Sequence, residues 1–303
     1  MFRVEASPRP VPVQRHSISL EELLSLRHWP PARAHSRERV SIREGQHQSH
    51  VRARGMEYDD VRQYQPGDDI RHLDWRLMAR TGEAYTKLYR EERERPVFFL
   101  ADLRTSMHFA TRGHFKSVLA AYASAMVIWT TLANGDRIGG SVLTRDGVKL
   151  FKPASHRQQA MQLIAAIHEG FTEPASPEQH ESGLQAQLSA LEALLPTGSI
   201  LYLFSDFQDA EPALQQQLTR LSQRCEIKLV LISDPLEAQL PAKGNYRFYG
   251  GGKQVDLAVS SGVQARYAAT FQARLDLVEP LMHIRGIELA HWHSNQHPLF
   301  FME

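Results

Sequence analysis

The chain has 303 residues, and its 35 Lys and Arg residues nearly balance its 34 Asp and Glu residues, for a net charge of +1. This balance excludes a protein whose overall field draws it to nucleic acid or to an anionic membrane. With 42% hydrophobic and 23% charged residues, the composition is that of a globular protein with a substantial core. The single cysteine, Cys225, excludes an intramolecular disulfide and a multi-cysteine zinc site, and it favours a reducing cytoplasm.

The first third of the chain is rich in proline and charge. Residues 1–18 predict a mobile tail, and they lack the basic start and apolar core of a secretory signal. Residues 19–95 predict a small accessory module. This module begins with a capping box at Ser19 and Glu22, which predicts a short amphipathic helix. The rest of it is dense in charge and too poor in apolar runs to form a core of its own.

From residue 96 onward, short apolar strands alternate with helices. Strands are predicted at residues 97–102, 199–204, 227–232 and 286–293, and helices at 115–133, 157–168, 184–195, 210–224 and 263–284. Hairpins are predicted over residues 137–151 and 246–259. This alternation predicts an α/β fold, a doubly wound and mostly parallel sheet flanked by helices. The most apolar stretch, residues 118–133, is interrupted by polar side chains, so we expect a buried core helix and no direct membrane insertion.

Acidic side chains stand at the ends of three predicted strands. Asp102, Asp206 and Asp234 each follow an apolar strand directly. In a doubly wound sheet the carboxyl ends of the strands form the edge at which ligands bind. We therefore expect these three acids to converge at one edge of the sheet.

Two stretches carry the most distinctive pattern, RGMEYDDVRQYQPGDDIRHLDWRLMART at residues 54–81 and LYREERERPVFFLAD at residues 88–102. Together they resemble the bacterial domain-of-unknown-function-58 family. The resemblance implies a von Willebrand factor A-like domain, here residues 96–303, behind an N-terminal segment. It also implies a MoxR-type AAA+ ATPase and other von Willebrand A-like proteins as partners, and a role as an adaptor or in assembling complexes. Many relatives have N-terminal membrane helices that this chain lacks, so we expect a cytoplasmic protein, peripheral to the inner membrane only through partners.

The first stretch contains a turn and a dense group of charges. Proline and glycine in Gln65-Pro66-Gly67-Asp68 suit the central positions of a tight turn. One interpretation is that the charges, with Trp75 as an apolar anchor, lock this segment onto the α/β body. The alternative is a partner-facing surface in which Trp75 and the arginines are hot spots. The residues to which we assign a structural role are Tyr64, Pro66, Gly67, Asp68, Asp69, Arg71, Asp74, Trp75 and Arg80.

The resemblance also implies a place for a metal. Von Willebrand A-like domains that bind Mg²⁺ use an Asp-x-Ser-x-Ser pattern after the first strand, with a threonine and an aspartate from later loops. Here Asp102 and Ser106 fit, but Arg104 occupies the first serine position. Ser182 stands where the threonine is expected, and Asp206 is the later acid. A fixed cation opposes Mg²⁺, so we predict a degenerate adhesion site in which Arg104 pairs with Asp102 or Asp206, and we expect no resident cofactor.

These patterns predict a non-enzymatic interaction protein. The carboxyl edge would bind partners, with Arg104 offering its charge to a partner carboxylate; the residues assigned to this contact are Asp102, Arg104, Ser106, Ser182 and Asp206, with Trp75 from the N-terminal segment. Two alternatives stay open, a metal-assisted hydrolase that uses Asp102 and Asp206, and a passive structural subunit of a larger complex. His291, His293 and His297 lie close enough in sequence to chelate a metal, but we expect ordinary strand-end histidines.

Overall fold

The chain divides into two compact units, Met1–Ala34 with Arg95–Glu303, and His35–Glu94. We call them the α/β unit and the small unit. A computed structural model describes residues 16–28, 56–65, 68–91, 95–172, 181–240, 244–250 and 253–296. The statements below concern these residues.

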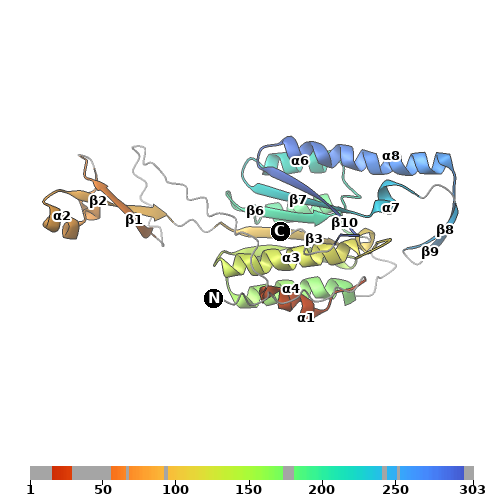
Figure 1. Ribbon diagram of the computed structural model, residues 1–303, viewed down its shortest axis with the longest axis horizontal. Helices are drawn as coiled ribbons and strands as arrows, with labels where there is room; N and C mark the ends of the chain where they lie inside the picture. Colours follow the sequence, from red (N-terminus) through yellow and green to blue (C-terminus); the bar gives the residue numbers. More distant parts are fainter. Residues whose placement is uncertain are drawn as a thin grey trace, which may run out of the picture. The chain divides into compact units, whose positions relative to one another are not determined.

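A six-stranded sheet with the order β10-β7-β6-β3-β4-β5 forms the centre of the α/β unit (Figure 1). Its strands are β3 (Val97–Leu103), β4 (Ile138–Thr144), β5 (Gly147–Ala154), β6 (Ile200–Ser205), β7 (Glu226–Ser233) and β10 (Ile287–His293). Neighbouring strands are parallel except β4 and β5, which form the predicted hairpin. Numbered in chain order within this sheet, the strands lie in the spatial order 3-2-1-4-5-6, and the third is antiparallel to its neighbour. This order confirms the predicted doubly wound, mostly parallel α/β fold.

Helices cover both faces of this sheet (Figure 1). One face packs against α3 (Lys116–Ala133) and α4 (Arg157–Thr172), and the other against α5 (Leu184–Glu192), α6 (Pro212–Leu221) and α8 (Ser261–Val278). Because both faces are covered, β3 and β4 are buried along their whole length and consist of nearly continuous apolar runs. Besides a short helical segment at the N-terminus, the α/β unit also contains η3 (Thr105–Met107), α7 (Pro235–Ala238), β8 (Gly244–Gly250), β9 (Lys253–Val259) and η4 (Glu279–His283).

Helix α3 is the predicted core helix. By length and composition it is apolar enough to cross a membrane, and 72% of it is buried inside the α/β unit. Its buried side chains pack against the sheet, against α4 and against the short N-terminal helix. The apolar character of α3 is thus accounted for by core packing.

The helix at the N-terminus belongs to the α/β unit, which corrects the predicted module of residues 19–95. Helix α1 (Leu20–Ser25) has the predicted capping box, in which Glu22 N donates to Ser19 Oγ over 3.1 Å, and η1 (Leu26–His28) follows it. Leu23 is completely buried, and Trp129 Nε1 on α3 donates to its carbonyl over 2.9 Å. Ile18 is also buried, so the predicted mobile tail of residues 1–18 does not extend to residue 18. Residues 1–15 lie outside the described residues.

The small unit is a hairpin with two short helical segments. Strands β1 (Met56–Gln63) and β2 (Tyr85–Glu91) pair antiparallel, and η2 (Ile70–His72) and α2 (Trp75–Thr81) connect them. Among the side chains whose burial is described in this unit, only Leu73 and Thr86 are buried. An isolated two-stranded hairpin is marginally stable by itself.

The packing of α1 is testable with one substitution. Leu23→Ala removes a completely buried side chain, so we expect a loss of roughly 2–4 kcal/mol in the free energy of unfolding, measured by urea denaturation. Leu20→Ala, on the exposed side of the same helix, is the control and should cost less than about 1 kcal/mol. Equal effects of the two substitutions would show that α1 does not pack in this way.

Candidate functional site

The three predicted acids come together at the carboxyl edge of the sheet. Asp102 is the last residue but one of β3, while Asp206 and Asp234 directly follow β6 and β7, and all three side chains are completely buried. In the parallel register of β3 and β6, Ala101 lies opposite Phe204. The residues that follow them, Asp102 and Ser205, are therefore neighbours at the end of the two strands. Ser205 Oγ accordingly donates to Asp102 Oδ2 over 2.6 Å.

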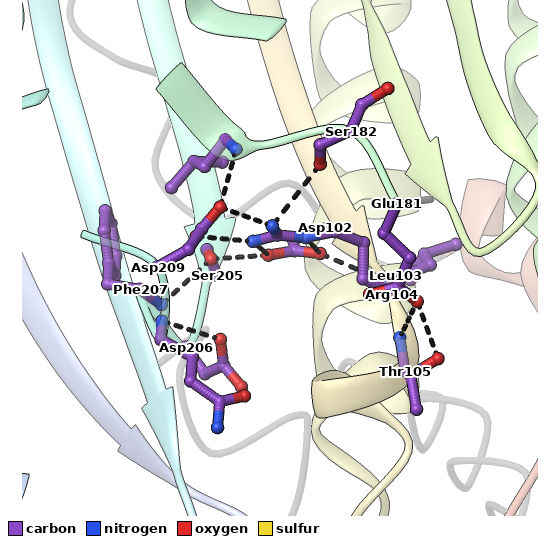
Figure 2. A network of polar contacts seen from close by, with 12 residues as sticks. Asp102, Leu103, Arg104, Thr105, Glu181, Ser182, Ser205, Asp206, Phe207 and Asp209 are labelled. Carbon is purple, nitrogen blue, oxygen red and sulfur yellow. Dashed lines mark hydrogen bonds and ion pairs between the residues drawn. The ribbon is translucent and has the colours of Figure 1, made fainter. Parts of the chain in front are cut away.

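Arg104 fills the space at this edge with its guanidinium group (Figure 2). On one side its Nε and Nη2 donate to the two oxygens of Asp102, over 2.9 and 2.7 Å. On the other side Nη1 and Nη2 donate to the two oxygens of Asp209, over 2.6 and 2.9 Å, and Nη1 also donates to the Ser182 carbonyl over 3.4 Å. These contacts engage all five N–H groups of the guanidinium. We call this arrangement the Arg104 clamp.

The clamp confirms one of the two predicted pairings. Arg104 pairs with Asp102, and it does not pair with Asp206. Its second partner is Asp209, which the sequence analysis missed; the signal available was an acid three residues beyond Asp206, in the same strand-end loop. Asp209 Oδ2 also accepts from Leu184 N over 2.9 Å, at the start of α5, so the clamp connects three loops.

Asp206 has a buried cation of its own. Lys116, at the start of α3, is completely buried, and its Nζ lies 2.7 Å from Asp206 Oδ2 and 2.6 Å from Glu237 Oε1. Arg274 on α8 lies 3.8 Å from the other oxygen of Glu237. Sequence reasoning also missed Lys116, whose only signal was a lysine at the start of an otherwise apolar helix. Each of the two acids expected to bind a metal is therefore paired with an internal cation.

Burial and ion pairing act in opposite directions on these groups. Complete burial raises the pKa of Asp102, and the hydrogen bonds from Arg104 and Ser205 oppose that shift. Burial also disfavours the charged form of Asp206, but the positive charge of Lys116 outweighs it and lowers the pKa of Asp206 below its ordinary value. The two carboxylates hold the pKa of Arg104 above its ordinary value despite its burial, so the clamp carries a permanent positive charge.

The turn after β6 has an unusual backbone. Phe207 is the one residue other than glycine, among those described, with a positive φ, at 52°. This left-handed conformation costs roughly 1–2 kcal/mol for a residue with a side chain. The Phe207 side chain is completely buried, and its N–H donates to Ser205 Oγ over 3.0 Å. Packing and this hydrogen bond hold the turn that presents Asp206 and Asp209.

The predicted serines contribute less than expected. Ser182 accepts from Arg104 with its carbonyl and not with its hydroxyl. The half-buried Ser106 makes no side-chain hydrogen bond to any residue that the structure describes. At the exposed rim, Glu181 Oε1 accepts from Thr105 N and Thr105 Oγ1 over 2.8 and 2.6 Å. This contact fixes the start of η3, the segment that would carry the metal-binding serines.

The Mg²⁺ site that the resemblance implies does not fit this chain. Both oxygens of Asp102 accept hydrogen bonds from Arg104, and Oδ2 also accepts from Ser205. A guanidinium beside this acid and an ammonium beside Asp206 repel a dication and provide no ligand oxygen. Within the described ranges, no group of three or more His, Cys, Asp or Glu residues is arranged to hold a metal ion.

The strand-end histidines form a small polar cluster. His291 Nε2 and His293 Nδ1 both contact Ser233 Oγ, over 2.7 and 3.2 Å. Burial and the neighbouring His293 lower the pKa of His291 to about 4. His297 lies outside the described residues. Asp234, which was expected at this edge, accepts from Thr111 Oγ1 over 2.7 Å and caps α7, so its role here is structural.

In the small unit, the acids of the charged motif have local partners. Asp68 accepts from Arg62 Nη2 over 2.6 Å and from Gln65 N over 3.0 Å, and these contacts lower its pKa, with the Gln65 amide as the larger cause. Asp69 caps η2 and Asp74 caps α2. Tyr64, another of the residues with a predicted structural role, donates its backbone N–H to the Ala84 carbonyl over 2.9 Å. Pro66 and Gly67 lie outside the described residues.

The fold and the strand-end acids define a doubly wound α/β protein whose carboxyl edge is occupied by the Arg104 clamp. A family model described as "Protein of unknown function DUF58" matches residues 60–275, and the chain belongs to this family. The uncharacterized proteins Rv1480 of Mycobacterium tuberculosis and Mb1516 of Mycobacterium bovis are 25% identical to it over 201 residues, 66% of this chain. The matched region spans 62% of the length of these relatives.

Solved structures give weaker similarities. BatB from Bacteroides thetaiotaomicron is 13% identical with a TM-score of 0.42, covering 69% of this chain and 93% of its own. The SpRpn10 VWA domain is 10% identical with a TM-score of 0.40, covering 69% and 94%. An aerotolerance-related membrane protein from Bacteroides fragilis is 15% identical with a TM-score of 0.37, covering 66% and 93%.

Removal of the clamp should destabilise the protein strongly. Arg104→Ala leaves the completely buried Asp102 without its counter-charge, so we expect a loss of roughly 3–5 kcal/mol in urea denaturation. Arg104→Lys keeps the charge but loses the two-pronged contacts, and it should lie between alanine and wild type. Arg220→Ala, which removes an exposed arginine, should change stability by no more than about 1 kcal/mol. A similar small effect of Arg104→Ala would contradict the clamp.

A second prediction concerns acid stability. His108 follows η3, its Nε2 contacts the Leu103 carbonyl over 3.0 Å, and burial with the charge of Arg145 lowers its pKa from 6.5 to about 4. Between these two values the unfolded chain binds a proton that the folded chain does not, so this group's contribution is complete above pH 6.5 and decreases as the pH falls. In His108→Gln this part of the pH dependence should disappear. Identical stability–pH curves for the two proteins would refute the assignment.

Proposed function

We propose that the chain is a non-enzymatic interaction protein that works in the cytoplasm with a MoxR-type AAA+ ATPase. The Arg104 clamp carries this proposal. Asp102 and Asp206, the acids that a hydrolase would use, are completely buried and ion-paired. A catalytic acid or base must come within hydrogen-bond distance of its substrate, so these contacts favour a binding role over metal-assisted hydrolysis.

The clamp also changes the expected mode of partner binding. The guanidinium of Arg104 is buried and its five N–H groups are engaged, so it has no donor left for a partner carboxylate. Partner contact at this edge would instead use the exposed rim, where Thr105, Glu181 and Gln208 are accessible. The role of the degenerate site is then to fix the shape of this rim without a metal.

The choice of partner is carried over from the family resemblance. Family membership and the closed adhesion site support an adaptor, and other von Willebrand A-like proteins are further candidate partners. A passive structural subunit would form a stable complex whose assembly is independent of nucleotide. An adaptor of an ATPase is expected to bind its partner differently in the ATP and ADP states, because nucleotide shifts the conformational equilibrium of the ATPase.

The proposal is tested by binding of the purified chain to the MoxR-type ATPase of the same organism. We expect a complex whose affinity depends on nucleotide and decreases at least tenfold in Gln208→Arg, which changes an exposed rim side chain. Glu288→Lys on β10, whose side chain is 68% exposed, is the control and should bind like the wild type. Absence of a complex would contradict the ATPase partnership, and full binding by Gln208→Arg would contradict use of the rim.

Calorimetry with MgCl₂ and MnCl₂ tests the closed site separately. The wild type and Arg104→Lys should give no saturable heat, because each places a cation beside Asp102. Arg104→Ser restores the Asp-x-Ser-x-Ser pattern at residues 102–106 and should gain measurable affinity. Saturable binding by the wild type at low millimolar concentration would mean that a cation competes with the clamp, and the metal-assisted alternative would gain support.

A further inference from the structure

Residues 70–80 of the small unit expose two large apolar side chains and three arginines. Ile70 is 64% exposed and Trp75 is 60% exposed, the highest values among the large hydrophobic residues that the structure describes. Arg71, Arg76 and Arg80 are exposed in the same segment. We call these five residues the Trp–Arg face.

The local structure explains why these side chains are exposed. In α2, Leu77 and Met78 are half-buried, whereas Trp75, Arg76 and Arg80 are exposed. The exposed positions are spaced one, four and five residues apart, which places them on one side of a helix. Asp74 N donates to Tyr85 O over 2.8 Å, which holds the start of α2 on β2. The outer side of α2 is therefore fixed in orientation by the rest of the small unit.

The acidic side chains of this segment are hydrogen-bonded, whereas its arginine side chains have no such partner among the described residues. The acids serve the backbone: Asp69 accepts from Arg71 N over 2.9 Å, and Asp74 accepts from Arg76 N and Leu77 N over 3.0 Å each. The guanidinium groups of Arg71, Arg76 and Arg80 make no hydrogen bond or ion pair with any residue in the described part of the chain. The three guanidinium groups are thus not paired with the neighbouring carboxylates of Asp69 and Asp74, which are hydrogen-bonded to backbone amides.

We propose that the Trp–Arg face binds an acidic segment of a partner protein, with carboxylates on the arginines and an apolar side chain on Trp75. Tryptophan and arginine are the residue types most enriched at binding hot spots. The guanidinium fork matches a carboxylate in two-pronged geometry. This inference rests on the proposed function as an interaction protein, and it adds a second binding surface with a defined chemistry.

Charge favours an acidic protein over the other anions that arginines bind. Asp69, Asp74 and Glu83 stand near the arginines in the sequence, so this segment offers no continuous positive track to a long phosphate backbone or to an anionic lipid surface. The whole chain carries a net charge of only +1, so it provides no long-range attraction to a polyanion. A short acidic segment can place its carboxylates on the arginines and avoid these acids.

The test uses the full chain and a fluorescein-labelled peptide of alternating glutamate and leucine, followed by fluorescence anisotropy. We expect saturable binding that weakens with salt and exceeds that of the matching lysine–leucine peptide at least tenfold. Trp75→Ala and the double variant Arg76→Glu/Arg80→Glu should each weaken binding at least tenfold. The controls are Met282→Ala, which removes another exposed apolar side chain (54% exposed), and Arg157→Glu, and both should bind like the wild type.

Several outcomes would overturn the proposal. These are no binding of the acidic peptide, unchanged binding by the Trp75 and arginine variants, or stronger binding to single-stranded DNA or phosphatidylserine vesicles. The proposed function is separable from this inference. If the ATPase complex forms and depends on Gln208 while the Trp–Arg face fails these tests, the adaptor proposal stands and the second surface is wrong.

Discussion

The carboxyl edge of this protein depends on one buried guanidinium. Arg104 lies between Asp102, at the end of the first strand of the sheet, and Asp209, in the loop after β6. It also contacts the segment before α5 through the Ser182 carbonyl. Three loops are therefore held together by a side chain of the protein itself. Its guanidinium stays charged at any physiological pH.

A buried ion pair has a known energetic character. Removing a guanidinium and a carboxylate from water costs about as much as their attraction returns, so such a pair adds little stability compared with apolar packing. The ion pair instead fixes the relative orientation of the loops, because the guanidinium makes two hydrogen bonds to a carboxylate on each side. Lys116 does the same for Asp206 and Glu237 on the other side of the edge. Together the two cations hold the strand-end acids of this edge in fixed ion pairs.

The order of strands and helices in the α/β unit could be predicted from the sequence because each buried strand is a short apolar run between turns. The convergence of Asp102 and Asp206 followed from that order. The pairing of Asp209 with Arg104 and of Lys116 with Asp206 could not be predicted, since each pair joins segments about 90 or more residues apart whose approach depends on loop geometry. The position of α1 was also missed. Its amphipathic pattern predicts a helix but does not identify the surface that buries Leu23.

The central claim is that a guanidinium takes the place of a metal ion. The most direct test is a crystal structure of the wild-type protein grown with MnCl₂, with anomalous scattering used to locate manganese. The account predicts the Arg104 guanidinium in contact with Asp102 and Asp209, and no anomalous peak at the carboxyl edge. A manganese ion coordinated by Asp102, with Arg104 displaced toward solvent, would contradict it.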